Sequence, residues 1–175
     1  MLINESYIEV RDMMAKLSDV EVGPLAHKID HEGVIPDSLR TKLNENGLMG
    51  IFIPEEYGGM GVDFKSSMLA TEVLGGGHSF SVAYGAHTGI GTLPLLYYGN
   101  EEQKQKYIPK LGSGEWKAAY CLTEPSSGSD ANSAKSKAKL SDDGKHYIIN
   151  GQKMWITNAG FANLFTVFAK IDDDK

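Results

Sequence analysis

The spacing of apolar residues changes partway along this sequence, and that change is the strongest constraint on its fold. In the first two thirds, apolar residues recur every three or four positions, as they do between Val10 and Leu17, which predicts amphipathic helices. After Trp116 the pattern becomes alternating, which is typical of strands. We therefore predict an α+β fold: an all-α helical bundle over residues 1–116, followed by the first strands of an antiparallel β domain over 117–175.

Several helices are expected in the first part. One runs from about Tyr7, is interrupted by Gly23-Pro24, and resumes as a kinked helix that ends near Gly33. A short helix over 37–46 is expected to end at Gly47, a residue suited to the left-handed conformation. Further helices are predicted over 66–74, 80–90 and 100–112.

Strands are expected to follow. Lysines alternate with small or apolar residues along 134–140, which indicates a strand with one solvated face rather than an anion-binding patch. The segment 141–144 predicts a hairpin turn into 146–149, and 152–157 and 164–170 are expected to continue the sheet. About four strands are too few to cover both faces of a sheet, so we expect the chain to be a fragment.

Composition narrows the possible functions. The 175 residues are 41% hydrophobic and 23% charged, with a net charge of −6, which fits a globular protein and disfavours nucleic-acid binding. The single cysteine, Cys121, excludes an internal disulfide and indicates a reducing compartment. His27 and His31 have no third ligand, so no metal site is predicted. Without a membrane span, signal peptide or Arg-rich presequence, a cytoplasmic protein is expected, although a processed organelle protein would look the same.

Two stretches carry candidate chemistry. In 120–130, an apolar run turns abruptly into Pro-Ser-Ser-Gly-Ser-Asp, a loop rich in hydroxyls and free backbone donors that suits an anion. In 151–158, Trp155 stands two positions before Thr157, so on a strand both would face the same side. Together the stretches could hold a planar cofactor with phosphates. The residues alone equally fit an apolar hairpin with a serine-rich loop and a buried tryptophan.

Both stretches resemble the flavin-binding signatures of the acyl-CoA dehydrogenase family. The family's patterns also match Leu-Met-Gly-Ile at 48–51, Pro-Glu-Glu-Tyr-Gly-Gly at 54–59 and the segment 99–104. The resemblance extends to Lys175 and corresponds to the family's N-terminal helical domain and part of its middle β domain. The C-terminal helical catalytic domain of the family has no counterpart in this sequence.

The resemblance implies FAD as the cofactor. Thr123 would lie at the pyrimidine end of the flavin, where a donor stabilises negative charge, and Ser129 would touch phosphate or acyl-CoA. Trp155 would pack beside the isoalloxazine. The implied cofactor residues are Tyr120, Cys121, Leu122, Thr123, Gly128, Ser129, Trp155, Ile156 and Thr157.

The helix over 80–90 is the candidate substrate surface. Its small residues indicate close helix packing when read alone. In the family resembled, the equivalent helix lines the acyl pocket, which makes Val82 and Ala86, together with Ser129, the implied substrate-binding residues. Gly85-Ala86-His87 is similar to the very-long-chain members, so a long acyl chain is expected.

The family reaction converts a fatty acyl-CoA into a trans-2-enoyl-CoA. Its base is a glutamate of the C-terminal domain, so no catalytic residue is assigned here, and Glu124 matches a structural acid of the signature. The resemblance implies an electron-transfer flavoprotein as electron acceptor and a homo-oligomer. Two alternatives remain open: a non-catalytic flavin- or acyl-CoA-binding module of the same fold, and an acyl-CoA oxidase that passes electrons to oxygen.

Overall fold

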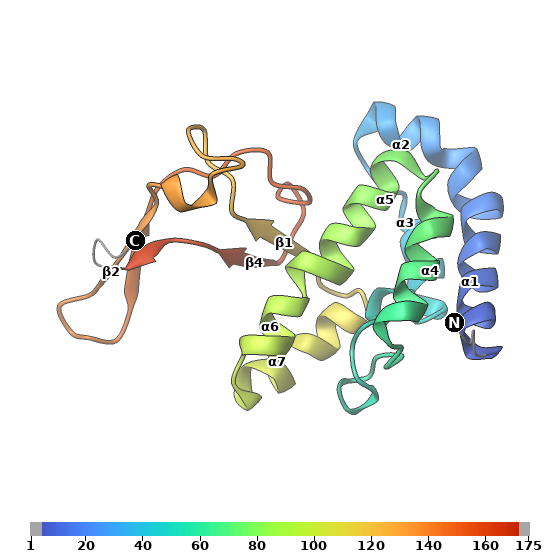
Figure 1. Cartoon of the computed structure of the whole chain (residues 1–175), viewed down its shortest axis with the longest axis horizontal. Helices are drawn as coiled ribbons and strands as arrows, with labels where there is room; N and C mark the ends of the chain where they lie inside the picture. Colours follow the sequence, from blue (N-terminus) through green and yellow to red (C-terminus); the bar gives the residue numbers. More distant parts are fainter. Residues whose placement is uncertain (1–4, 172–175) are drawn as a thin grey trace.

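Helices and strands occupy separate parts of the molecule. The computed structural model describes residues 5–171, with side chains from residue 8 onward; the outer ends of the two predicted domains, 1–4 and 172–175, lie outside the described residues. The first helix, α1 (Glu5–Leu17), lies at one end of the molecule, and the strands extend away from the helices at the other end (Figure 1). This arrangement confirms a helical region followed by a few strands.

The helical part contains seven α-helices among the described residues, linked by short 3₁₀ and π segments. The α-helices are α1 Glu5–Leu17, α2 Ala26–Glu32, α3 Asp37–Glu45, α4 Phe64–Leu74, α5 His78–Gly85, α6 Leu93–Tyr98 and α7 Glu101–Gly112. The π segments are Ser18–Val22 and Ala86–Gly91, and the 3₁₀ turns among the helices are Gly23–Leu25, Leu48–Gly50 and Glu55–Tyr57; a further 3₁₀ turn, Ala131–Ser133, lies between the first two strands.

The core of this part is formed by the apolar stripes that the sequence predicts. Met14 of α1 and Leu39 of α3 are fully buried, and they share one cluster with Phe80 of α5. Burying such side chains contributes about 1.5–3 kcal/mol each. α1 packs along α4. The predicted kink is confirmed, because π and 3₁₀ turns separate α1 from α2, and Gly33 ends α2 with a φ of 66°.

Side chains define where two of the predicted helices begin. The Asp63 carboxylate accepts the Ser66 backbone N–H at the start of α4. Asn100 and Gln103 form a reciprocal capping box at the start of α7, each side chain bonding the other's backbone N–H. Both helices therefore begin where unpaired N–H groups receive an acceptor.

Five short strands follow within the part of the chain that the structure describes, and their pairing is mixed. They are β1 Ala118–Cys121, β2 Lys137–Leu140, β3 Tyr147–Asn150, β4 Leu164–Val167 and β5 Lys170–Ile171. β2 and β3 are antiparallel through the predicted turn at 141–144, with Ala138 opposite Ile149. β1 and β4 pair in parallel, as do β2 and β5. The expected antiparallel pairing therefore holds only for β2 and β3. In the two parallel pairs, the chain between the partners, residues 122–163 and 141–169, brings the second strand back in the same direction as the first.

The strand predicted over 152–157 is wrong. Residues 151–156 have no strand structure, and Trp155 has a φ of 54°. The Met154 backbone N–H bonds the Thr123 carbonyl at 2.9 Å, but the left-handed residue that follows prevents a continued ladder. Trp155 and Thr157 consequently do not share a face by strand alternation.

β1 joins the two parts of the molecule by packing against the π segment Ala86–Gly91. A Cβ atom at Gly91 would lie 2.7 Å from Cβ of Ala118, so only glycine permits this approach. The buried His87 ring spans the junction: Nε2 lies 3.1 Å from the Leu111 carbonyl of α7, and Nδ1 accepts the Ala118 N–H at 3.1 Å. No helix among the described residues is long and apolar enough to cross a membrane.

Candidate functional site

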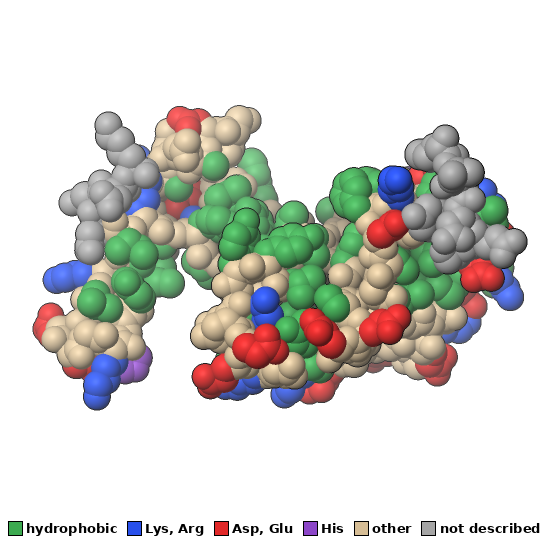
Figure 2. Space-filling model, turned by 60° about the horizontal axis from the view of Figure 1, so that its bottom comes forward, with side chains coloured by type: hydrophobic (Ala, Val, Ile, Leu, Met, Phe, Trp, Pro, Cys, Tyr) green, Lys and Arg blue, Asp and Glu red, His purple; other side chains and the backbone are tan. Residues whose placement is uncertain are grey.

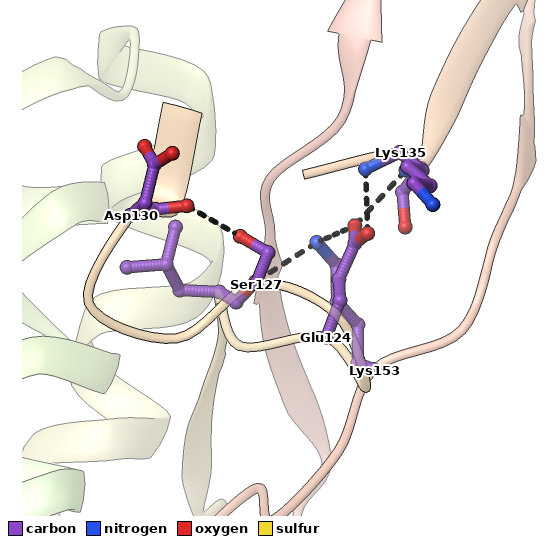
Figure 3. Close-up of polar contacts among 7 residues, drawn as sticks. Glu124, Ser127, Asp130, Lys135 and Lys153 are labelled. Carbon is purple, nitrogen blue, oxygen red and sulfur yellow. Dashed lines mark hydrogen bonds and ion pairs between the residues drawn. The ribbon is translucent and has the colours of Figure 1, made fainter. Parts of the chain in front are cut away.

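The candidate site begins where β1 ends. β1 is almost wholly buried, and the chain leaves it at Leu122 to form a tight loop. Glu124 and Ser127 exchange backbone hydrogen bonds of 2.9 and 3.1 Å, and the Ser127 hydroxyl donates to the Asp130 carbonyl at 2.8 Å (Figure 3). The buried Ser127 thus holds the loop together and leaves Gly128 and Ser129 exposed.

Glu124 is a buried carboxylate with donors on both oxygens. Oε1 accepts the Lys153 ammonium at 2.8 Å and the Ser136 N–H at 2.9 Å, while Oε2 accepts the Lys135 N–H at 2.6 Å (Figure 3). The Lys153 ammonium, followed by the Ser136 and Lys135 donors, holds the pKa of Glu124 far below its usual range. Glu124 is therefore ionised at neutral pH and fully engaged, as a structural acid would be.

Lys153 brings the two candidate stretches together. Its ammonium also donates to the Leu122 carbonyl at 3.1 Å, and its side chain is largely buried beside Glu124. With the Met154–Thr123 backbone bond, this contact fixes 153–154 against 122–124. We define the Glu124–Lys153 cluster as these two side chains with the backbone donors of Lys135 and Ser136.

The sequence reasoning did not single out Lys153 or Asn158. Lys153 is the one charged residue within 151–158, and Glu124 is the first charged residue after Lys117. Because isolated charges in apolar segments are rarely buried unpaired, these two opposite charges are the sequence feature that could have indicated the ion pair. Asn158 is buried, and its Nδ2 donates to the carbonyls of Ala83 and Ala118 at 2.9 and 3.2 Å. No local pattern predicts these partners, because they lie 75 and 40 residues away.

The predicted cofactor residues fall into three groups according to how exposed they are to solvent. Cys121 is buried, and burial raises the pKa of its thiol. Half-buried positions are held by Tyr120, Leu122, Thr123, Ile156 and Thr157. Gly128, Ser129 and Trp155 are exposed, and Trp155 has 86% of its surface accessible.

The exposed Trp155 is unusual for so large an apolar ring. It directly follows Met154, which is bonded to Thr123, so an uncovered aromatic surface adjoins the end of β1. Tyr120 packs on Phe168, with ring centroids 4.9 Å apart. The hydroxyl-bearing loop, the exposed ring and the Thr123 side chain suit a flat ligand with an anionic tail.

The predicted substrate residues lie on one helical face in different environments. Val82 is 61% exposed, whereas Ala86 is buried. A hollow of about 230 Å³ lies beside them, between α4 and the α5 region, and its lining includes Ser81, Gly85 and Gly89 rather than Val82 or Ala86. Small residues do leave space here, on the face next to the one predicted.

Other ligand chemistry finds less support. His27 and His31 are both exposed on α2. Among residues 5–171, no three histidine, cysteine, aspartate or glutamate side chains lie close enough together to hold a metal ion.

Comparisons with known proteins match the chain over nearly its whole length. Residues 4–115 match the family model described as acyl-CoA dehydrogenase, N-terminal domain, and 119–175 match that of the middle domain. A probable acyl-CoA dehydrogenase of Bacillus subtilis is 50% identical over 98% of this chain and 27% of its own length. The human very long-chain specific acyl-CoA dehydrogenase is 48% identical over 82% of this chain and 22% of its own.

A solved structure of the same family has the same fold as this chain. The acyl-CoA dehydrogenase of Bacillus anthracis, complexed with FAD, superposes with a TM-score of 0.87 at 44% identity, covering 97% of this chain and 29% of that one. The chain thus spans about a quarter of the length of these relatives. By its matched domains, its sequence identity and its fold, the chain belongs to the acyl-CoA dehydrogenase family.

Proposed function

We propose that this chain forms the helical and flavin-contacting part of an FAD-dependent dehydrogenase that oxidises long-chain fatty acyl-CoA thioesters to trans-2-enoyl-CoA. The observation that carries the proposal is the Glu124–Lys153 cluster, which fixes the two signature stretches against each other and leaves Trp155 exposed beside the end of β1. The relative from Bacillus anthracis is complexed with FAD.

The residues of the site fit FAD. Exposed Trp155 offers an aromatic surface for the isoalloxazine, and the exposed Gly128 and Ser129 offer backbone and hydroxyl donors for phosphate oxygens. FAD would supply the acceptor for the β-hydrogen of the thioester. Thr123 and Thr157, both half-buried, would donate hydroxyl hydrogen bonds to the ring edge, and the half-buried Ile156 would keep water from it.

The base that removes the α-proton belongs to a part of the family fold beyond these residues. At the candidate site the buried carboxylate is Glu124, whose oxygens accept three donors that hold its pKa far below its usual range, so it lacks the basicity for proton abstraction. Its role is to hold Thr123 and Met154 in register.

Substrate and partners follow from the same proposal. The acyl chain would run along α5 past the exposed Val82, on the face next to the hollow that Ser81, Gly85 and Gly89 line, and the human relative that is 48% identical is named very long-chain specific. Electron-transfer flavoprotein would reoxidise the enzyme. The exposed apolar side chains of β3, including Ile148 and Ile149, favour a homo-oligomer that covers them.

The visible spectrum of the complete natural gene product tests this proposal. Recorded anaerobically, it should show a flavin band that bleaches when palmitoyl-CoA is added and bleaches less with butyryl-CoA. Reoxidation should be slow in air and fast with electron-transfer flavoprotein; rapid reoxidation by air would identify an oxidase. A product with no flavin band and no thioester oxidation would favour a binding module and contradict the proposal.

A further inference from the structure

Asn158 directly follows the proposed flavin-edge residue Thr157 and connects it to two other elements of the site. Its Nδ2 donates to the Ala83 carbonyl of α5 at 2.9 Å and to the Ala118 carbonyl of β1 at 3.2 Å. Ala83 in turn follows Val82, the exposed residue of the proposed acyl surface. A single amide therefore links the segment that would contact flavin with the helix along which the acyl chain would lie.

The Asn158 side chain is held in one orientation at a cost in stability. Its backbone has a φ of 69°, a left-handed conformation that asparagine adopts more readily than most residues. The side chain is only 8% exposed, and the two carbonyls match the two hydrogens that Nδ2 carries. Its Oδ1 is buried without a hydrogen-bond partner among the described residues, which is unfavourable. Such a combination of backbone strain and an unpaired buried acceptor is typical of residues that serve a functional site.

The chain on either side of Asn158 is anchored to β1. After it, the Asn163 side chain accepts the Lys117 N–H, next to the start of β1, at 3.0 Å. Before it, the Met154 N–H bonds the Thr123 carbonyl, beyond the end of β1, at 2.9 Å. The residues between these anchors are thus fixed along the strand, and the amide adds the hydrogen bond that sets their position relative to α5.

We propose that Asn158 is a positioning residue that aligns the acyl chain with the flavin edge. Given the proposed function, on which this inference rests, the amide fixes Thr157 relative to Val82, so a tail lying along α5 holds the thioester in one place before the flavin. Binding energy from the remote part of the substrate then raises the rate of oxidation and not only the affinity. A short acyl chain, which makes fewer contacts with α5, gains less.

Single-turnover kinetics of the complete, flavin-loaded gene product test this role. Asn158→Gly removes the amide and keeps a residue suited to the left-handed backbone. The anaerobic bleaching rate per bound flavin at saturating palmitoyl-CoA should fall about 10- to 100-fold, because the reacting atoms are no longer held in register. The dissociation constant of palmitoyl-CoA should stay within about threefold, and the ratio of the palmitoyl-CoA rate to the butyryl-CoA rate should fall at least about tenfold.

Two further variants separate alignment from packing. Asn158→Asp preserves the shape but removes both N–H donors, so it should lower the same ratio of rates. Asn163→Ala is the matched control, because its exposed side chain bonds the backbone beside β1 without contacting α5, and its ratio should stay within about twofold. In the flavin-free protein, hydrogen–deuterium exchange over 155–162 should be faster in Asn158→Gly than in the native protein and native in Asn163→Ala.

The outcomes distinguish this role from the proposed function. A native protein without a flavin band would contradict the proposed function and the role of Asn158 with it. A native protein that bleaches, with an equal loss of rate for both thioesters in Asn158→Gly, would mean that the amide only supports the fold. An unchanged rate, an affinity loss without a rate loss, or native exchange in Asn158→Gly would likewise overturn the positioning role.

Discussion

A single ion pair holds together two segments that lie about 30 residues apart. Glu124 and Lys153 are both largely buried, and Lys135 and Ser136 supply backbone donors to the same carboxylate. A buried ion pair is stabilising only when its remaining hydrogen-bonding capacity is satisfied, which is the case for Glu124. Removing one partner leaves the other charge buried without compensation.

We expect Glu124→Gln to reduce the free energy of unfolding by about 2–3 kcal/mol, because the Lys153 ammonium loses its counter-charge. Urea denaturation at pH 7 measures this. Asp12→Asn, which removes the exposed Arg11–Asp12 pair, is the control and should cost less than about 1 kcal/mol. Recovery of part of the loss in the double variant Glu124→Gln/Lys153→Met would support the ion pair; a neutral effect of Glu124→Gln would refute it.

The loss of stability caused by Glu124→Gln should depend on pH. Because the pKa of Glu124 is lowered in the folded state, its stabilisation is fully present above the unfolded carboxylate pKa of about 4.3 and is lost as the pH falls towards the folded value. The difference in unfolding free energy between the native protein and Glu124→Gln should therefore be constant from pH 5 to 7 and shrink at more acid pH.

At the residue scale, the sequence predicts a structural role for Glu124, with which its hydrogen bonds agree, but not its partner Lys153. The signature resemblance implied a structural acid, and the three donors explain why that acid is needed. Lys153 and Asn158 were missed because their partners are distant in sequence. Long-range pairing of single polar groups leaves no periodic signal.

Among the elements, the junction of the π segment Ala86–Gly91, α7 and β1 determines where the site begins. His87 receives the Ala118 N–H and faces the Leu111 carbonyl, so one neutral ring satisfies groups from a helix end and a strand start. Gly91 permits the same strand to approach the helix. These two contacts position the start of β1, and hence Thr123, two residues beyond the end of that strand.

His87→Gln should change how stability depends on pH. Burial lowers the pKa of His87 to about 4, so below pH 6.5 the unfolded state gains a proton that the folded state does not. The native protein should lose up to about 1.4 kcal/mol per pH unit from this group between pH 6.5 and 4. Denaturation curves across that range should be flatter for His87→Gln, and the exposed-residue control His31→Gln should keep the native profile. A native profile in His87→Gln would contradict the assignment.

Gly91→Ala and Gly89→Ala form a matched pair. The added methyl at 91 would lie 2.7 Å from Cβ of Ala118, whereas at 89 it meets nothing within 4 Å. We expect Gly91→Ala to cost about 1–3 kcal/mol in chemical denaturation and Gly89→Ala to cost nothing measurable. Equal effects of the two substitutions would mean that β1 does not pack this closely on the helix.

At the element scale, helices were predicted better than strands. Helix starts at Asp63 and Asn100 are determined by neighbouring residues, so local sequence is sufficient. The strand expected over 152–157 failed because its partner offers one backbone bond and because Trp155 is left-handed. Parallel pairing of β1 with β4 depends on a connection of about 40 residues, which no local pattern encodes.

On the scale of the whole molecule, many large apolar side chains remain uncovered. Hydrophobic side chains appear on both the helical and the strand parts in Figure 2. Tyr98 is 88% exposed and Trp155 is 86% exposed, well beyond what an isolated globular surface needs. The relatives are several times longer than this chain. We propose that flavin and neighbouring subunits cover these exposed apolar surfaces.

The contact between Trp155 and FAD is the central claim and can be measured directly. The complete gene product would be labelled with 5-fluorotryptophan, stripped of flavin and titrated with FAD, with the Trp155 resonance assigned by its loss in Trp155→Phe. We predict that the fluorine resonance of Trp155 shifts in proportion to bound FAD while that of half-buried Trp116 does not. Stoichiometric FAD binding with an unmoved Trp155 resonance would contradict the account.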